Sequence, residues 1–182
     1  LDLDLFREQI QYLRKHYHII TMEEVIHSID NQVKIPRKSV LLTFDDAYSD
    51  HYMNVFPILD NYQLQGSFYT PSKAITENTV LDVNKIHFIL ASAQDKSDIV
   101  TDLKYLLKAY KKEYQLQDFD YYYKKLTCVD NYDTEEVIFI KRLLQVELTE
   151  ELRIKITDTL FEKYVGMSET SFSRELYMNE DQ

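Results

Sequence analysis

The sequence predicts an α/β fold class in which a short strand–helix–strand segment is followed by a long, all-helical part. Three observations lead to this prediction. The apolar run 40–44 has the length of a strand and ends in two aspartates. A second short run, 67–70, follows a helical stretch over about 50–62. From about residue 82 onward the chain shows helical periodicity almost throughout.

Two helices are expected before the first strand. Apolar residues recur at helical spacing over residues 3–17. Thr21 and Glu24 have the spacing of a capping box and begin the second helix. A polar connector broken by Pro36 then leads to the strand 40–44. Because this short strand is largely apolar, we expect it to be buried on both faces.

The segment that follows predicts a βαβ unit. Pro57 lies inside the helical stretch 50–62, so the helix starts late or bends there, because proline lacks an amide donor. Gly66 precedes the second strand and Pro71 ends it. A strand, a crossover helix and a second strand within so few residues predict two parallel, neighbouring strands.

The remaining sequence predicts helices with apolar stripes. One stripe covers 99–110. Asp133 and Glu136 have capping-box spacing before a second, while Thr149 caps a third that Gly166 terminates. No fixed-period repeat is visible, which disfavours a solenoid.

These patterns divide the chain into three parts. We assign 1–81 to the βαβ-containing part and 82–177 to the helical part. Residues 178–182 show the start of a further helix, since Asn179 and Gln182 stand at N-cap and N3 spacing. We expect this helix to be truncated and the chain to be a fragment of a longer protein.

Composition excludes several classes of protein. The formal net charge is −10 with no dense lysine or arginine cluster, which argues against a nucleic-acid partner. No apolar stretch approaches the length of a membrane span. The single cysteine, Cys128, excludes an internal disulfide framework and is expected to be buried. These features favour the cytoplasm, although the chain begins at Leu1, so an amino-terminal signal could be missing.

Asp45 and Asp46 are the candidate functional residues. They stand at the carboxyl end of the first βαβ strand, where functional groups gather in parallel α/β folds. Neighbouring strand residues point to opposite faces, so one acid could bind a cation while the other addresses water. That division suits metal-assisted hydrolysis. The alternative is that either acid caps the following helix or turn, as Asp50 and Ser49 are expected to do.

The stretch LLTFDDAYSDHYMNVFPILDNYQLQGSFYTPSKAI resembles the first motif and the following βαβ segment of NodB-homology polysaccharide deacetylases. The resemblance covers about residues 20–75, and the part 82–177 looks like an insertion carried by some members. The resemblance implies a partial, TIM-like (β/α) barrel and a hydrolase that removes acetyl groups from an N-acetylated glycan. By the same resemblance, Asp45 is the general base, Asp46 is a metal ligand and the metal is zinc.

The sequence departs from the family pattern in two places. Ala47 replaces a glycine, which costs about 1 kcal/mol if the backbone there has a positive φ. The family's His-x-x-x-His motif is absent, because no two of the five histidines are four residues apart. A hydrolytic zinc needs three protein ligands, so we expect this chain alone to be inactive. His51, although close to the acids in sequence, is expected to be exposed.

Two other functions fit the same residues. A non-catalytic deacetylase-like domain could bind a glycan or protein through its helical part. Alternatively, Asp45 and Asp46 could hold Mg²⁺ for phosphoryl transfer, which requires only oxygen ligands. The sequence lacks a glycine-rich phosphate loop, which disfavours this last function. It indicates neither the particular glycan nor the oligomeric state.

Overall fold

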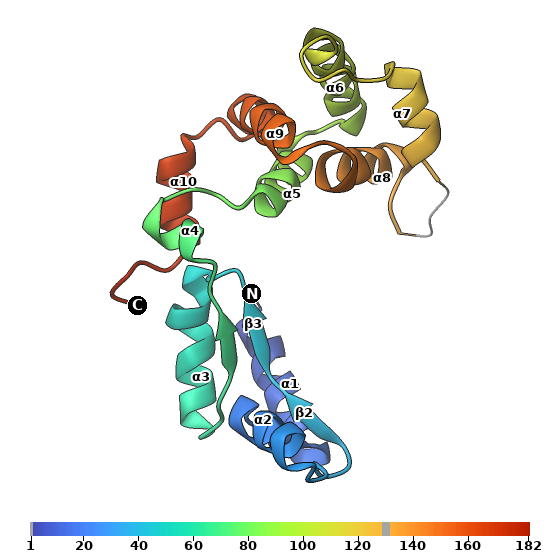
Figure 1. Ribbon diagram of the computed structural model, residues 1–182. Coiled ribbons are helices and arrows are strands. Elements are labelled where there is room, and N and C mark those ends of the chain that lie inside the picture. Colours follow the sequence, from blue (N-terminus) through green and yellow to red (C-terminus); the bar gives the residue numbers. More distant parts are fainter. Residues whose placement is uncertain (1, 129–131) are drawn as a thin grey trace. The chain divides into compact units, whose positions relative to one another are not determined.

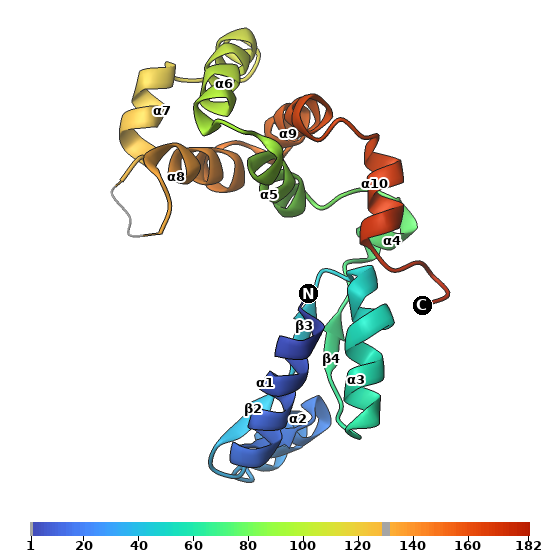
Figure 2. The same cartoon turned by 180° about the vertical axis from the view of Figure 1, so that it is seen from behind.

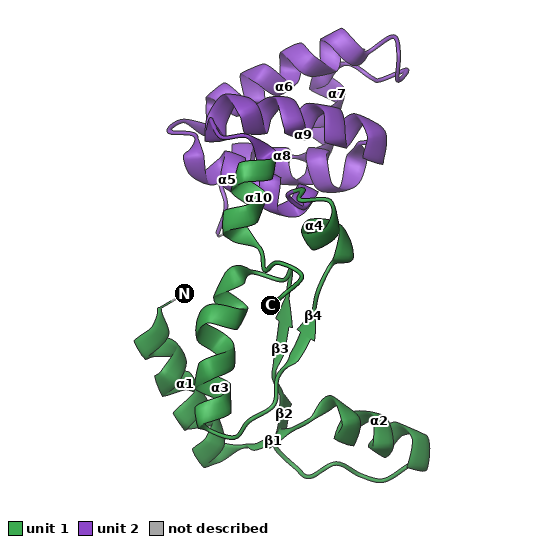
Figure 3. Cartoon of the chain, turned by 90° about the vertical axis from the view of Figure 1, so that its left-hand side faces the viewer, with its two compact units in different colours: residues 1–79, 170–182 green, residues 80–169 purple. Residues whose placement is uncertain are grey.

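The computed structural model describes residues 2–128 and 132–182. They form two compact units (Figure 3). We call residues 1–79 together with 170–182 the α/β unit, and residues 80–169 the helical unit. The helical unit thus interrupts the α/β unit along the chain. The sequence placed the helical part at 82–177, whereas Thr170–Gln182 group with the α/β unit.

Over residues 2–79, the described part of the α/β unit before the helical unit, the chain forms four strands and five helical segments. In chain order these are α1 (Leu3–His16), β1 (His18–Ile20), α2 (Met22–Asn31), β2 (Ser39–Leu41), β3 (Thr43–Asp45), the π-helical turn η1 (His51–Val55), α3 (Phe56–Asn61), β4 (Ser67–Tyr69) and α4 (Ser72–Thr76). The unit is completed by α10 (Glu169–Leu176), except for its first residue.

The strands form two parallel pairs. β1 pairs with β2, and β3 pairs with β4 in the register Phe44↔Phe68 and Asp45↔Tyr69. The parallel βαβ unit predicted from the sequence is therefore confirmed. The apolar run 40–44 divides into β2 and β3, and β1 was not predicted because three residues are too few to show a period. Within the described residues these pairs do not close into a barrel.

One face of these strands carries the core of the unit. α1 and α3 lie beside the strands, as the two opposite views in Figures 1 and 2 show. Leu42 packs with Ile10 of α1, Val55 of η1 and Leu59 of α3, and Phe44 packs against this cluster. Thr43 and Asp45 on the alternate face are exposed. The prediction of a strand buried on both faces was wrong, because helices cover only the face that carries Leu42 and Phe44.

Gly66 permits a close approach between β4 and this core. A Cβ atom at Gly66 would lie 2.8 Å from Cε2 of Phe44 and 3.0 Å from Cδ1 of Leu59. Both distances are shorter than ordinary van der Waals contact. A glycine is therefore needed where β4 begins beside Phe44.

Local signals placed the helix starts of this unit well. Thr21 and Glu24 form the predicted capping box, in which each backbone N–H donates to the other residue's side chain. At Pro57, α3 starts late, at Phe56, after the turn η1 in which the Phe56 N–H donates to the His51 carbonyl. This agrees with the effect expected of proline inside a helix.

The described residues of the helical unit form five α-helices and one π-helical turn. These are α5 (Asp82–Ser92), α6 (Lys96–Tyr110), α7 (Phe119–Leu126), α8 (Glu135–Arg142), η2 (Leu143–Glu147) and α9 (Glu150–Val165). No helix in the described residues is both long enough and apolar enough to cross a membrane.

Gly166 ends its helix as predicted from the sequence, whereas the N-cap of α8 lies one residue later than predicted. Gly166 ends α9 with φ +70°, in the left-handed region that favours glycine. The cap of α8 is Thr134, whose side chain accepts from the Val137 N–H, rather than the predicted Asp133. Asp133 instead pairs with Lys141. Cys128 is half-buried, less than predicted, and its thiol is free.

The core of the helical unit is built from apolar stripes, together with one buried cation. Ile86 and Ile89 of α5 and Ile156 and Leu160 of α9 are almost completely buried. Lys85 lies in the same region with 5% of its side chain exposed. It pairs with Asp158 of α9 and, at 2.8 Å, with Glu169. The N–H of Val80, the first residue of the unit, also donates to the carboxylate of Glu169, its last residue. The two ends of the helical unit are therefore in contact.

Candidate functional site

Asp45 and Asp46 lie where the sequence predicted, at the carboxyl end of β3. Asp45 is the last strand residue, pairs with Tyr69 of β4, and is exposed on the face away from the apolar cluster. Asp46 is half-buried, and the Tyr48 hydroxyl lies 3.5 Å from its Oδ2 atom. The two acids therefore occupy neighbouring positions in different surroundings at a parallel strand edge.

The structure does not support the alternative in which these acids cap a helix. The N-cap position of η1 is occupied by Asp50, as predicted, but its side chain makes no capping hydrogen bond. The Asp50 carboxylate instead accepts from the Asn54 side chain. Among the described residues, no helix-cap hydrogen bond involves Asp45 or Asp46.

The turn after β3 has an uncommon backbone. Asp46 and Ala47 have φ values of +73° and +56°, so both adopt the left-handed conformation. Ala47 is also almost completely buried, with 1% of its surface exposed. The positive φ considered from the sequence is present, and alanine is strained there.

Replacing Ala47 with glycine is expected to stabilise the protein by about 1 kcal/mol. Glycine adopts a positive φ without the clash of a Cβ atom, and this outweighs its larger entropy loss on folding. Urea unfolding of the two proteins at neutral pH measures the difference. A neutral or destabilising effect would mean that the packing of the buried Ala47 methyl group matters more than the backbone strain.

The segment 175–178 holds this turn from a distant part of the chain. The Met178 N–H donates to the Ala47 carbonyl at 2.8 Å. Tyr48 and Tyr177 form an antiparallel bridge, and their rings stack at 5.9 Å. The Ser49 hydroxyl donates to the Glu175 carbonyl at 3.1 Å. No local sequence signal could have predicted these contacts, because they join residues more than 120 positions apart.

His51 is the site residue that the sequence analysis misjudged. It was expected to be exposed, but it is half-buried among the rings of Phe44, Tyr48 and Phe68, whose centroids lie 5.6–5.9 Å from its own. Its Nδ1 atom is buried and has no hydrogen-bond partner among the residues that the structure describes. Burial lowers the pKa of His51, although the nearby carboxylates of the loop oppose this shift. Burial thus favours the uncharged form of the imidazole.

The described residues do not form a complete metal site. Asp45 and Asp46 offer carboxylate oxygens, which are suitable ligands for zinc or magnesium. No group of three or more His, Cys, Asp or Glu side chains within the described residues could hold a metal ion. A hydrolytic zinc site, with its three protein ligands, is therefore not formed by these residues alone.

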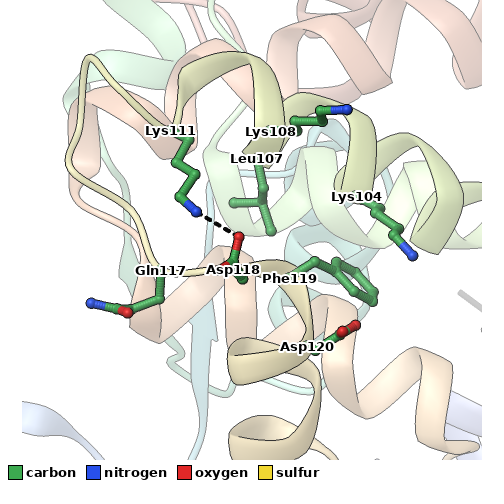
Figure 4. Close-up of a pocket in the computed structure, with 8 residues that line it drawn as sticks. All are labelled: Lys104, Leu107, Lys108, Lys111, Gln117, Asp118, Phe119 and Asp120. Carbon is green, nitrogen blue, oxygen red and sulfur yellow. Dashed lines mark hydrogen bonds and ion pairs between the residues drawn. The ribbon is translucent and has the colours of Figure 1, made fainter.

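A separate cavity of about 320 Å³ lies in the helical unit, between α6 and the start of α7 (Figure 4). Lys104 and Lys108 of α6 line it, and Lys111 forms an ion pair with Asp118. The Lys104 ammonium lies 5.2 Å from the centre of the Phe119 ring. This cavity contains none of the residues that the sequence marked as functional.

Comparison with known proteins gives a consistent result. Residues 32–113 match the family model described as polysaccharide deacetylase, so the match continues from the α/β unit into the helical unit. A segment of 58 residues is 38% identical to the poly-beta-1,6-N-acetyl-D-glucosamine N-deacetylase of Escherichia coli (strain K12). This segment makes up 31% of this chain and 9% of the relative. No solved structure matches the chain significantly.

Two further relatives agree. The enzyme of the same name from Staphylococcus epidermidis is 30% identical over 80 residues, covering 43% of this chain and 27% of the relative. A Bacillus subtilis (strain 168) protein whose name includes polysaccharide deacetylase is 30% identical over 71 residues, or 38% of this chain and 25% of the relative. The chain thus spans about a quarter or less of the length of these curated relatives. Residues 32–113, just under half of this chain, are thus similar to polysaccharide deacetylases.

Proposed function

We propose that this chain is part of a metal-dependent polysaccharide deacetylase that hydrolyses the N-acetyl groups of an amino-sugar glycan. The observation that supports the proposal is the position of Asp45 and Asp46 at the carboxyl end of β3, beside the parallel strand β4, within the segment that matches the family. The relatives named above carry the name of an N-deacetylase of poly-beta-1,6-N-acetyl-D-glucosamine. In this proposal the strands are part of a (β/α) barrel and the helical unit is its insertion.

Asp45 has the role of general base. It is exposed on the face away from the core, so a water molecule and an acetamido group can reach it. In the hydrolysis, Asp45 takes a proton from the water molecule as its oxygen attacks the acetyl carbonyl carbon. The carbon–nitrogen bond then breaks, the leaving nitrogen receives the proton that Asp45 took from the water molecule, and the products are acetate and a free amino sugar.

Asp46 has the role of a metal ligand. Because it is the half-buried neighbour of Asp45, it can bind a cation while Asp45 faces the substrate. When bound, zinc would stabilise the negative charge that develops on the acetyl oxygen. The described residues lack the further ligands, so we propose that the complete protein supplies them and that this chain alone releases no acetate.

The test is acetate release by the complete protein with zinc and an N-acetylglucosamine oligosaccharide. Asp46→Ala should abolish both activity and zinc retention, and Asp45→Asn should lower kcat by about 10²–10⁴-fold while zinc is retained. Asp60→Asn, which changes an exposed acid of α3, is the matched control and should leave both unchanged. Unchanged acetate release by the Asp46 variant would refute the metal-ligand role.

A non-catalytic glycan-binding module is the second candidate. It is favoured by the lack of a three-ligand group among the described residues. A complete protein that has no His-x-x-x-His motif and releases no acetate would establish this candidate in place of the enzyme.

A further inference from the structure

The turn that carries Asp46 has a backbone conformation that the local chain does not favour. Asp46 and Ala47 both have a positive φ, and the left-handed conformation costs a residue with a Cβ atom about 1–2 kcal/mol. Such a conformation persists where the surrounding structure fixes it. The turn therefore depends on contacts from outside itself.

The segment 175–178, at the end of α10, provides these contacts within the α/β unit. The Met178 N–H donates to the Ala47 carbonyl, and Tyr177 forms an antiparallel bridge with Tyr48. Backbone contacts from this segment thus reach both residues that follow the candidate metal ligand. They hold the turn immediately after the acid.

Tyr177 anchors this segment. Tyr177 is 3% exposed, whereas Glu175 is exposed and Leu176 and Met178 are half-buried. Its ring stacks on the ring of Tyr48, with the two centroids 5.9 Å apart and 21° between the planes. Because a buried aromatic ring dominates the energy of a small contact, Tyr177 contributes more to the position of the turn than its neighbours do.

Both flanks of the segment are ordered as well. Before it, the Ser173 hydroxyl donates to the Ala74 carbonyl at 3.4 Å. After it, the Asn179 N–H donates to Gln182 Oε1 at 3.2 Å, which is a bond of the predicted helix start, although no helix forms over these last residues. Tyr177 is therefore held from both sides and can act as a fixed support.

Tyr48 connects Tyr177 to the candidate metal ligand. The Tyr48 hydroxyl lies 3.5 Å from Oδ2 of Asp46, and the Tyr48 ring meets the His51 ring edge-on at 5.7 Å. A displacement of Tyr48 would thus reach the Asp46 carboxylate through the backbone and through this hydroxyl. A reacting group misplaced by about 1 Å can lower a rate by about 100-fold, so the position of Tyr48 matters for catalysis.

From these contacts, we infer that Tyr177 is a positioning residue of the proposed active site. By holding Tyr48 and the turn, Tyr177 sets the direction of the Asp46 carboxylate. This inference rests on the proposed function and adds to it a residue outside 32–113, the segment similar to polysaccharide deacetylases. It makes the site depend on a part of the chain that follows the helical unit.

Hydrogen exchange of the complete protein without metal, followed by mass spectrometry, tests whether Tyr177 holds the turn. In Tyr177→Leu, the segment 175–178 should exchange about tenfold faster or more, because its bond to Ala47 opens more often. Tyr177→Phe keeps the ring and should exchange at the wild-type rate. Tyr48→Leu removes the other ring of the stack and should match Tyr177→Leu, so the test remains decisive if that variant does not fold.

Zinc retention and kinetics of the complete protein separate positioning from simple support of the fold. Tyr177→Leu should weaken zinc binding and lower kcat, each by about tenfold or more per folded molecule. KM should stay within about twofold, because the buried Tyr177 side chain cannot touch the substrate. Tyr177→Phe should restore zinc binding and kcat. A residue that only supports the fold would lower the folded fraction and leave both values per folded molecule unchanged.

Tyr62→Leu is the matched control, since Tyr62 at the end of α3 packs against the apolar cluster of the same unit. It should lower stability but leave zinc binding, kcat and the exchange of 175–178 unchanged. Unchanged zinc binding and kcat in Tyr177→Leu, or equal losses in Tyr62→Leu, would overturn the positioning role. If the wild type releases no acetate, the proposed function fails, and the exchange rate alone then decides whether Tyr177 holds the turn.

Discussion

Replacing Lys85 with alanine is expected to lower the free energy of unfolding of the helical unit by about 2–4 kcal/mol. The Lys85 ammonium is nearly inaccessible and pairs with Asp158 and Glu169. Removing one partner of a buried ion pair leaves the other charges uncompensated. We expect the lower part of this range, because Asp158 and Glu169 are 47% and 30% exposed and water can reach them.

The matched control is Lys155→Ala on α9. Lys155 also pairs with two carboxylates, those of Glu113 and Glu151, but its side chain is 40% exposed. Its replacement should have a much smaller effect, because exposed ion pairs contribute little. Urea unfolding monitored by far-UV circular dichroism measures both variants. Equal losses for the two lysines would show that burial does not strengthen the Lys85 pairs.

The contribution of Lys85 should also depend on pH in a defined direction. Burial by itself would lower the pKa of Lys85, but the carboxylates of Asp158 and Glu169 outweigh burial and raise it. A group whose pKa is raised by folding stabilises the protein fully below its unfolded pKa, which is about 10.4 for lysine. The difference between the wild type and Lys85→Ala should thus persist through neutral pH and decrease only in strongly alkaline solution.

Replacing Leu59 with alanine is expected to destabilise the α/β unit by about 2–5 kcal/mol. Leu59 is 2% exposed and packs with Ile10, Leu42 and Val55. The cluster is small and covers one face of the strands, so neighbouring side chains cannot easily refill the lost volume. Because Leu42 and Phe44 lead directly into the acid-bearing turn, NMR should show changed amide shifts at Asp45 and Asp46.

Leu5→Ala provides the comparison for Leu59→Ala. This substitution makes the same chemical change at a position on α1 where the leucine is 53% exposed. We expect a change of no more than about 0.5 kcal/mol, as is usual for surface substitutions. If Leu59→Ala were as mild as Leu5→Ala, the apolar cluster would not be what supports β3 and β4.

The sequence by itself determined the local elements of this protein. Apolar periodicity predicted the βαβ unit and the helices, Thr21 and Glu24 predicted a capping box that is present, and Gly166 predicted a helix end. The position of Asp45 and Asp46 at a parallel strand end also followed from the order of residues. These features depend on neighbours within a few positions, so a single sequence contains the information.

Only the tertiary structure decided which face of each strand is covered, how the turn after β3 is held, and where His51 lies. Thr43 is exposed although its strand is otherwise apolar, because α1 and α3 pack on the opposite face. The segment 175–178 returns to the acid-bearing turn after the whole helical unit, and His51 is enclosed by rings from two strands and the loop. These contacts join residues far apart in the chain, so their energy depends on the complete fold and leaves no periodic pattern in the sequence.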